Sequence, residues 1–129
     1  MGGKVGIGEH LLEAAKREVL EETGAASLTN YEYRGIVSER LVQGDGALMN
    51  HFLIFVGHGE IDSYSESHRE GKLALFSLDE ISAHQSEFLP SDWFMFDCFR
   101  EANSTPYLYE AELEHNQGAY TLKYYRKAV

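Results

Sequence analysis

The chain has 129 residues, which is enough for one domain with a hydrophobic core but not for two independent domains. Its 21 Asp and Glu residues outnumber 11 Lys and Arg residues, and the net charge of −10 disfavours stable nucleic-acid binding. A single cysteine, Cys98, excludes an internal disulfide framework, and no membrane-length apolar run or secretory pattern is seen, so we expect a cytoplasmic protein without membrane contact.

The first half of the chain predicts one helix followed by two strands. Residues 1–8 are rich in glycine, and apolar residues then recur near helical spacing from Glu9 until Gly24 ends the run. Aromatic and β-branched residues predict strands over 31–38 and 51–56, and the glycines around Asp45 are typical of the turn between them.

The second half predicts a loop, a short strand, two helices and a hairpin. Residues 57–72 are polar and precede the apolar run 73–76, which we interpret as a strand. A capping serine, Ser77, begins one helix, and Pro90 opens another that runs towards residue 101. Alternating residues on both sides of 116–118 predict a C-terminal hairpin. No linker interrupts the chain, so we expect one mixed α/β (α+β) domain over 1–129.

Three glutamates on the predicted first helix indicate a metal site. Glu18, Glu21 and Glu22 are separated by three and four residues, so their carboxylates share one face of the helix. Like charges at this spacing repel, and hard oxygen ligands suit Mg²⁺ or Mn²⁺. A solvated acidic face is the alternative interpretation.

These glutamates belong to a longer spaced pattern, in which glycine, five residues, glutamate and seven residues precede Arg-Glu-aliphatic-x-Glu-Glu-x-Gly-aliphatic. Its members are Gly3, Glu9, Arg17, Glu18, Val19, Glu21, Glu22, Gly24 and Ala25. At roughly 5 to 7% abundance for each residue type, the identities would arise by chance in roughly one such chain in a million. The pattern resembles the Nudix box, with Ala25 smaller than the usual aliphatic residue.

The resemblance implies a Nudix-like mixed sheet with the box helix on one side and shorter helices on the other. It also implies a metal-dependent hydrolase of a diphosphate linkage in a nucleoside triphosphate or related nucleotide. The strands that normally precede the box are missing, so the resemblance implies an N-terminally shortened domain. A strand of another subunit, or the C-terminal hairpin of the chain itself, is the alternative that would fill the gap. Because a sheet edge left unpaired invites association, we expect a homo-oligomer, and a monodisperse monomer in light scattering would contradict this.

The resemblance also assigns roles to individual residues. The three helix glutamates would bind the metal, joined by the main-chain carbonyl of Gly2, while Gly3 would bring the backbone close to substrate. Arg17 is placed with the catalytic residues, in the role of orienting Glu18 or Glu9. Glu18 is the first candidate for the general base and Glu70 the second, with Glu66 as an alternative and a solvated loop acid as the plain interpretation of both.

Substrate preference is suggested by the residues downstream of the box. The markers that the ADP-ribose and dinucleoside-polyphosphate groups carry there are absent, which favours nucleoside triphosphates. Asp92 would then accept hydrogen bonds from a purine, although capping of its helix together with Ser91 is the stronger interpretation. Trp93 would stack on the base, although aromatic residues crowded on a short helix more often belong to the core.

Two other classes of function stay open at this point. The chain could be a Nudix-type binding or regulatory module that holds a nucleotide without hydrolysing it. It could also be a remnant that serves only as an interaction domain. Metal titration distinguishes the interaction-only remnant from the hydrolase and the nucleotide-binding module, because a remnant without an assembled site would not bind Mg²⁺ or Mn²⁺ at its glutamates.

Overall fold

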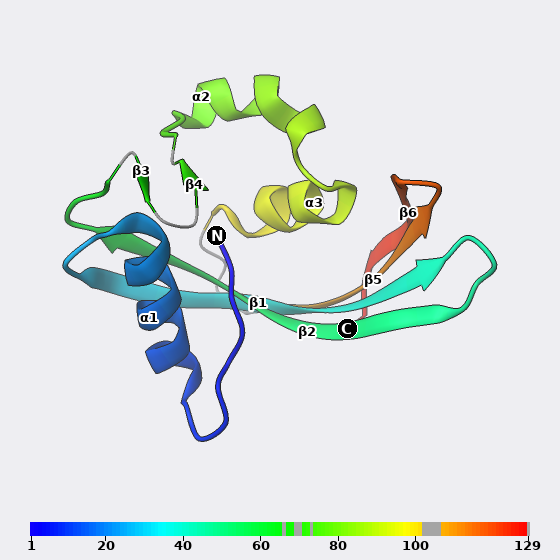
Figure 1. Cartoon of the computed structure of the whole chain (residues 1–129), viewed down its shortest axis with the longest axis horizontal. Helices are drawn as coiled ribbons and strands as arrows, with labels where there is room; N and C mark the ends of the chain where they lie inside the picture. Colours follow the sequence, from blue (N-terminus) through cyan, green and yellow to red (C-terminus); the bar gives the residue numbers. More distant parts are fainter. Residues whose placement is uncertain (66, 69–70, 73, 102–106, 129) are drawn as a thin grey trace. The chain divides into compact units, whose positions relative to one another are not determined.

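The computed structural model describes residues 1–65, 67–68, 71–72, 74–101 and 107–128. Its sheet has four strands in the order β2-β1-β5-β6, with β1 parallel to β5 and β5 antiparallel to β6, and β3 and β4 form a separate antiparallel pair (Figure 1). This confirms the predicted mixed α+β fold. In chain order the elements are α1 (Leu11–Thr23), β1 (Leu28–Gln43), β2 (Leu48–Ile61), β3 (Ser67–His68), β4 (Gly71–Lys72), α2 (Leu78–Ile81), the 3₁₀ helix η1 (Ser82–Glu87), α3 (Pro90–Phe99), β5 (Tyr107–Asn116) and β6 (Ala119–Lys127).

The chain folds into two compact units. Unit 1 comprises residues 1–31 and 59–76 and contains α1, and unit 2 comprises residues 32–58 and 77–129 and contains α3, β5 and β6. The long strands β1 and β2 run through both units. The expectation of a single domain over 1–129 stays a prediction.

The helix α1 of unit 1 begins and ends where the sequence predicts. At its start, the Glu13 carboxylate accepts a hydrogen bond from the His10 N–H at 3.1 Å. At its end, Gly24 takes the left-handed conformation with φ of 72° and donates its N–H to the Leu20 carbonyl at 2.9 Å. Glycine adopts this conformation without steric cost, so Gly24 ends the helix.

A single aspartate holds the chain that leaves α1. The backbone N–H groups of Ala26 and Ser27 both donate to Asp62 Oδ1, each at 3.1 Å. The hydrogen bond from Ser27 is the main cause of a lowered pKa of the Asp62 carboxyl. The end of β2 is thereby attached to the start of β1 within unit 1.

In unit 2, the buried residues of α3 pack against the buried residues on one face of β1. The buried residues of α3 recur every four positions, at Ser91, Met95 and Phe99. On β1 the alternate position Val37 is fully buried and packs with Met95 and Phe99, together with Ala111 of β5. A strand presents every second residue to one face, so 35, 37 and 39 of β1 face α3.

Gly35 of β1 permits α3 to approach the strand closely. A Cβ atom on Gly35 would overlap the Phe99 ring and would lie 2.8 Å from the Tyr107 carbonyl oxygen. Arg34, the residue before Gly35, is buried. Its Nη1 donates a hydrogen bond to the Phe99 carbonyl at the end of α3, at 2.7 Å. The predicted helix therefore ends at Phe99, short of residue 101, with its last carbonyl bound to Arg34.

The predicted turn between the first two strands and the predicted C-terminal hairpin both form. The turn between β1 and β2 has the Gln43 N–H bonded to the Ala47 carbonyl at 2.8 Å, and both strands are longer than predicted. Between β5 and β6, Gln117 and Gly118 have φ of 51° and 79°. Two successive positive φ angles suit the right-handed twist of an antiparallel pair, so this turn sets the register of the hairpin.

The predicted strand over 73–76 is wrong for the residues that can be described. Positions 74–76 have no regular secondary structure, position 73 lies outside the described residues, and the short strands β3 and β4 lie in the segment predicted as a loop. Leu75 and Phe76 are 66% and 43% exposed. A strand there would gain little from burial, so the apolar run alone does not produce one.

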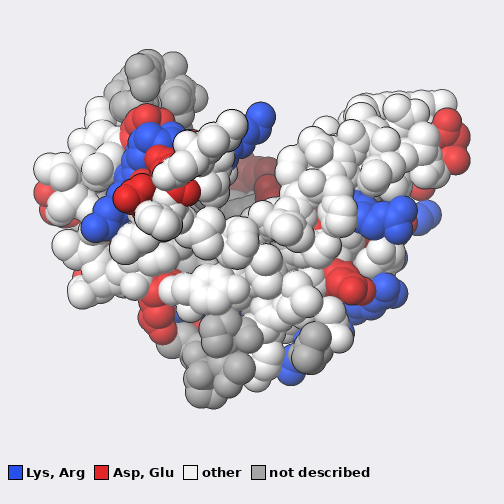
Figure 2. Space-filling model, turned by 90° about the horizontal axis from the view of Figure 1, so that it is seen from below, with Lys and Arg blue, Asp and Glu red and all other residues white. Residues whose placement is uncertain are grey.

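Three acidic residues of β5 in unit 2 form ion pairs with cations. Figure 2 shows Lys and Arg side chains beside Asp and Glu side chains in several places on the face that it views. Three outward glutamates of β5 each contact a cation, in the pairs Glu110–Arg126 at 3.0 Å, Glu112–Arg40 at 3.6 Å and Glu114–Lys123 at 3.5 Å. Among the helices that the structure describes, none is long and apolar enough to cross a membrane.

Candidate functional site

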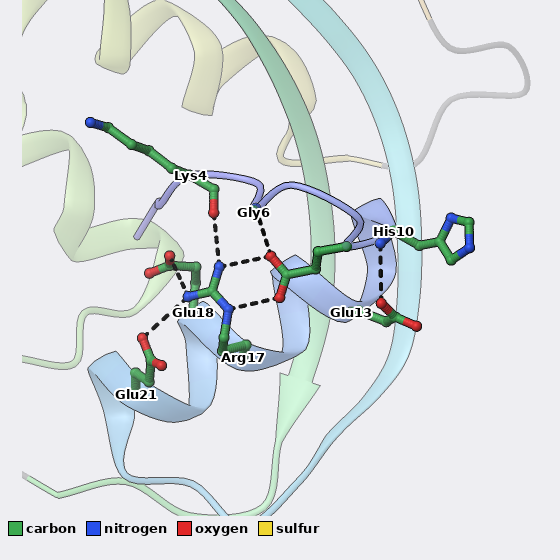
Figure 3. A network of polar contacts seen from close by, with 8 residues as sticks. Lys4, Gly6, His10, Glu13, Arg17, Glu18 and Glu21 are labelled. Atoms are coloured by element: carbon green, nitrogen blue, oxygen red, sulfur yellow. Dashed lines mark hydrogen bonds and ion pairs between the residues drawn. The ribbon is translucent and has the colours of Figure 1, made fainter.

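One arginine gathers the carboxylates of the box in unit 1. Arg17 Nε and Nη2 donate to the two oxygens of Glu9 at 2.8 and 2.9 Å, and Nη1 donates to Glu18 Oε1 at 2.7 Å (Figure 3). Nη1 also contacts Glu21 Oε2 at 3.4 Å, and Nη2 donates to the Lys4 carbonyl at 2.8 Å. The planar guanidinium suits this paired geometry. Arg17 contacts both of the carboxylates that the sequence offered as alternatives, and its orienting role stays a prediction.

The local sequence explains this arrangement. Glu21 lies one helical turn beyond Arg17, whereas Glu9 reaches it from the segment before α1. The Gly6 N–H donates to Glu9 Oε1 at 2.9 Å and fixes that segment. Hydrogen bonds from Arg17 first, and from Gly6 next, lower the pKa of Glu9 to about 2. The same contacts with Glu9 and Glu18 raise the pKa of Arg17, so its charge is permanent.

Because the pKa of Glu9 is lowered in the folded chain, the stability of unit 1 depends on pH. The carboxylate stabilises the fold fully above its ordinary pKa of 4.5, and this contribution is lost as the pH falls towards about 2. We expect the unfolding midpoint in urea to be higher for the wild type than for Glu9→Gln at about pH 6, and the difference to shrink near about pH 3. In an Arg17→Met background, Glu9→Gln should change the midpoint much less. A difference that does not depend on pH would contradict this assignment.

Gly3 lies against the carboxylate of Glu18. A Cβ atom on Gly3 would overlap Glu18 Cδ and Oε2, so only glycine fits beside this side chain. Glu18 therefore has Oε1 on Arg17 and Oε2 beside the backbone of Gly3. Nothing lies within 4 Å of the corresponding position on Gly2. The expected close approach of the backbone occurs at Gly3, and the contribution of the Gly2 carbonyl to a metal site stays a prediction.

The donor set of α1 has the chemistry that Mg²⁺ or Mn²⁺ requires. Within the described ranges, no three His, Cys, Asp or Glu side chains are gathered closely enough to form a metal cluster. Arg17 instead neutralises Glu18 and Glu21 through one oxygen of each and leaves their second oxygens outside these contacts. Glu22 lies on the same helix and is half-buried. The oxygen ligands fit a hard divalent cation, and its binding requires these carboxylates to converge.

Two predicted loop acids cannot be placed. Glu70, the second candidate for the general base, and Glu66, its alternative, both lie outside the described residues. Their roles stay predictions.

The residues predicted to bind the base lie at the start of α3 in unit 2. The N-cap of α3 is Leu89, with Pro90 as its first helical residue and no side-chain cap, so the capping interpretation of Ser91 and Asp92 is wrong. Ser91 is fully buried and faces the sheet, whereas Asp92 is exposed. Desolvation nevertheless raises the pKa of the Asp92 carboxyl.

Trp93 is half-buried among aromatic rings. Its ring centroid lies 5.4 Å from that of Phe88 in an edge-to-face contact and 5.6 Å from that of Phe96. Trp93 also lines an open surface depression together with Phe88 and Phe94. The ring thus belongs to an aromatic cluster and keeps a surface that a ligand could reach.

Glu39, the most buried glutamate in unit 2, is not among the site residues predicted from the sequence. It is 7% exposed and follows Val37 in the row of β1 that faces α3. Burial raises the pKa of Glu39, the nearby hydroxyl of Ser91 partly offsets this rise, and the charge of Asp92 adds to it. A charged residue in phase with the buried positions 35 and 37 is the signal that could have identified it.

Comparisons with known proteins identify the family of the chain. The sequence profile of the NUDIX domain matches residues 1–98. The crystal structure of a mutator MutT protein from Bacillus halodurans is similar, with 25% sequence identity and a TM-score of 0.66 over 98% of this chain and 79% of that chain. Among curated proteins, none matches the chain significantly. The match over residues 1–98 and the spaced glutamates and arginine on α1 show that the chain belongs to the Nudix domain family.

Proposed function

We propose that the chain is a divalent-metal-dependent hydrolase of a diphosphate linkage in a nucleoside triphosphate or a related nucleotide. The main support is the cluster on α1, in which Arg17 holds Glu18 and Glu21 in a Nudix domain. The family hydrolyses compounds that contain a nucleoside diphosphate linked to a further group, and the similar structure is that of a mutator MutT protein.

The residues of α1 would divide the work. Glu18, Glu21 and Glu22 would hold Mg²⁺ or Mn²⁺, and the main chain at Gly2 would approach the same place. When bound, the cation would supply Lewis-acid polarisation of the phosphoryl oxygens. Arg17 would keep the carboxylates oriented, because its donors are fixed in one plane. Glu18 would accept a proton from the attacking water, since its Oε2 is free of the contact with Arg17.

Two further residues of this proposal lie on α3. Asp92 is exposed at its first turn and would accept hydrogen bonds from the N–H groups of a purine. Trp93 would offer the face that it presents to the surface depression as a stacking platform for the base.

The test is release of phosphate or pyrophosphate from a panel of nucleoside triphosphates and nucleotide sugars, with Mg²⁺ or Mn²⁺ and with chelator. We expect metal-dependent turnover that Glu21→Gln lowers by roughly 10²-fold or more. Glu13→Gln is the matched control, because Glu13 also lies on α1 but contacts only the His10 N–H in the described hydrogen bonds. No turnover of any compound, together with measurable nucleotide binding, would favour the regulatory-module alternative.

Gly3→Ala should damage the site without unfolding the protein. The added methyl group occupies the position of the Glu18 carboxylate, so that side chain must turn away from Arg17. Because a displacement of about 1 Å at a reacting group can cost about 10²-fold in rate, we expect a loss of this order in turnover. Circular dichroism should stay unchanged, and Gly2→Ala, where nothing lies within 4 Å of the new atom, should have a much smaller effect. Equal effects of the two substitutions would show that the close approach is unimportant.

A further inference from the structure

The two edge strands of the sheet differ in their protection against pairing with another strand. The order β2-β1-β5-β6 places β2 at one edge and β6 at the other, so the C-terminal hairpin lies on the side of β1 away from β2. An edge strand has a row of outward backbone N–H and C=O groups, and charged side chains discourage pairing there. β6 carries three cations, Lys123, Arg126 and Lys127. The part of β2 that belongs to unit 2, residues 48–58, contains no Asp, Glu, Lys, Arg or Pro.

The sequence of this part of β2 is typical of a strand that is covered on both faces. Residues 52–56 are all apolar, whereas a strand with one face in solvent alternates apolar and polar residues. Ile54 and Val56 pack against the core cluster of unit 2, so the core covers one face. Because successive side chains of a strand point to opposite faces, Leu53 and Phe55 point away from that core. These two side chains are 63% and 42% exposed.

The exposed apolar surface extends along the strand. The large apolar residues of β2 that are at least 37% exposed are Leu48, Met49, Phe52, Leu53 and Phe55. On β6, Tyr120 is the only large apolar residue with such exposure. Apolar groups gain stability when they leave water, and a long, uncharged and apolar edge strand associates readily. The edge at residues 48–58 therefore calls for a partner that covers it, whereas the edge at β6 does not.

Charge and symmetry identify a second copy of the chain as this partner. Each copy has a net charge of −10, so two copies repel each other wherever their acidic surfaces meet. At residues 48–58 they can meet without bringing like charges together. Antiparallel pairing of this stretch with itself is self-complementary, as a two-fold axis requires, and it covers both edges at once. A partner that is recognised through charge would find no charged side chain on this stretch to bind.

We infer that the protein forms a two-fold dimer in which residues 48–58 of β2 pair antiparallel with the same residues of a second copy. Pairing that matches the whole stretch places Leu53, its middle residue, opposite Leu53 of the second copy. The two sheets then join into one continuous sheet, whose edges are the two cation-bearing β6 strands. Because those edges discourage further pairing, assembly stops at two copies. The inference is independent of the proposed hydrolase activity.

Sedimentation velocity of the full chain tests the association, and we expect a monomer–dimer equilibrium between about 1 and 100 µM, with the dimer dominant at the upper end. Leu53→Lys should weaken dimerisation roughly 100-fold or more, because it places two like charges opposite each other in the interface. Leu53 is largely exposed in the single chain, so circular dichroism should stay unchanged. Tyr120→Lys exchanges an exposed apolar residue of β6 in the same way and should keep the wild-type dimerisation. Met49→Lys, also at an exposed position of β2, replaces Leu53→Lys if that variant does not fold.

Hydrogen exchange locates the interface. The amide protons of residues 48–58 should exchange more slowly at about 100 µM than at about 1 µM, because the dimer protects the outward N–H groups of the edge. The amide protons of residues 119–127 on β6 should exchange equally at both concentrations. A monomer throughout this range, assemblies that grow beyond two copies, a dimer that the lysine variants of β2 leave intact, or a dimer without added protection over 48–58 would overturn the inference.

Discussion

Glu18→Gln is expected to lower the single-turnover rate constant of hydrolysis by roughly 10²- to 10⁴-fold, the range found when a general base is removed. Gln keeps the length of Glu18, and its carbonyl oxygen can still accept the bond that Arg17 Nη1 now gives to Oε1 at 2.7 Å. It loses the negative charge and the ability to take up a proton. The measurement is single-turnover hydrolysis of the best substrate of the panel, at saturating Mg²⁺.

Saturating cation matters in this experiment because Glu18 is also a proposed metal ligand. A loss that added Mg²⁺ or Mn²⁺ restores would assign Glu18 to binding alone, whereas a loss that persists at saturation supports its role as the base. Glu13→Gln changes the same residue type on the same helix and should stay within about threefold of the wild type, as expected for an exposed residue outside the site. Activity of Glu18→Gln within a few-fold of the wild type would exclude both roles.

Phe99→Ala should have the largest effect on stability, lowering the free energy of unfolding by about 3 to 5 kcal/mol. The ring is 3% exposed, meets Tyr109 edge to face at 5.5 Å, and fills the space that Gly35 leaves open. The cavity would be lined by Val37, Met95 and Ala111 of the same core cluster, and such surroundings relax only partially when a buried ring is removed. Urea unfolding followed by circular dichroism measures the loss.

Phe94→Ala is the matched control for this substitution. Phe94 lies on the same helix and stacks on Tyr125 at 5.5 Å, but it is 45% exposed. Because the hydrophobic contribution follows the area removed from water, we expect Phe94→Ala to cost about 1 kcal/mol or less. Similar losses for the two variants would mean that the layer around Phe99 is not the core of unit 2.

Elements with local determinants were predictable from the sequence. The helix α1 has apolar residues at helical spacing and a glycine stop, and the β5–β6 turn has adjacent residues that tolerate positive φ. The run 73–76 was misinterpreted because four apolar residues suit a strand or a loop equally until burial decides, and Leu75 is exposed. The lengths of β1 and β2 were underestimated because pairing between strands extends them beyond the residues with high strand propensity.

In the candidate site, too, contacts within one helix were predictable from the sequence, whereas contacts between distant elements were not. Arg17 meets Glu21 because the two lie one helical turn apart, and its contact with Glu18 is one of the two contacts that the sequence suggested. Glu39 and Ser91 are far apart in the sequence and come together only through the register of β1 against α3. That register depends on tertiary packing, which no local pattern encodes. The expected helix cap at Ser91 failed for the same reason, since packing turns this side chain into the core.

The fit between Gly35 and Phe99 also limits how this sequence can evolve. A side chain at position 35 would collide with the ring and with the backbone of β5, whereas a smaller residue at position 99 alone would leave a cavity. A smaller residue at position 99 would remove the collision with the ring but not the collision with the Tyr107 carbonyl. Position 35 is therefore expected to stay glycine in descendants of this chain, even where position 99 varies.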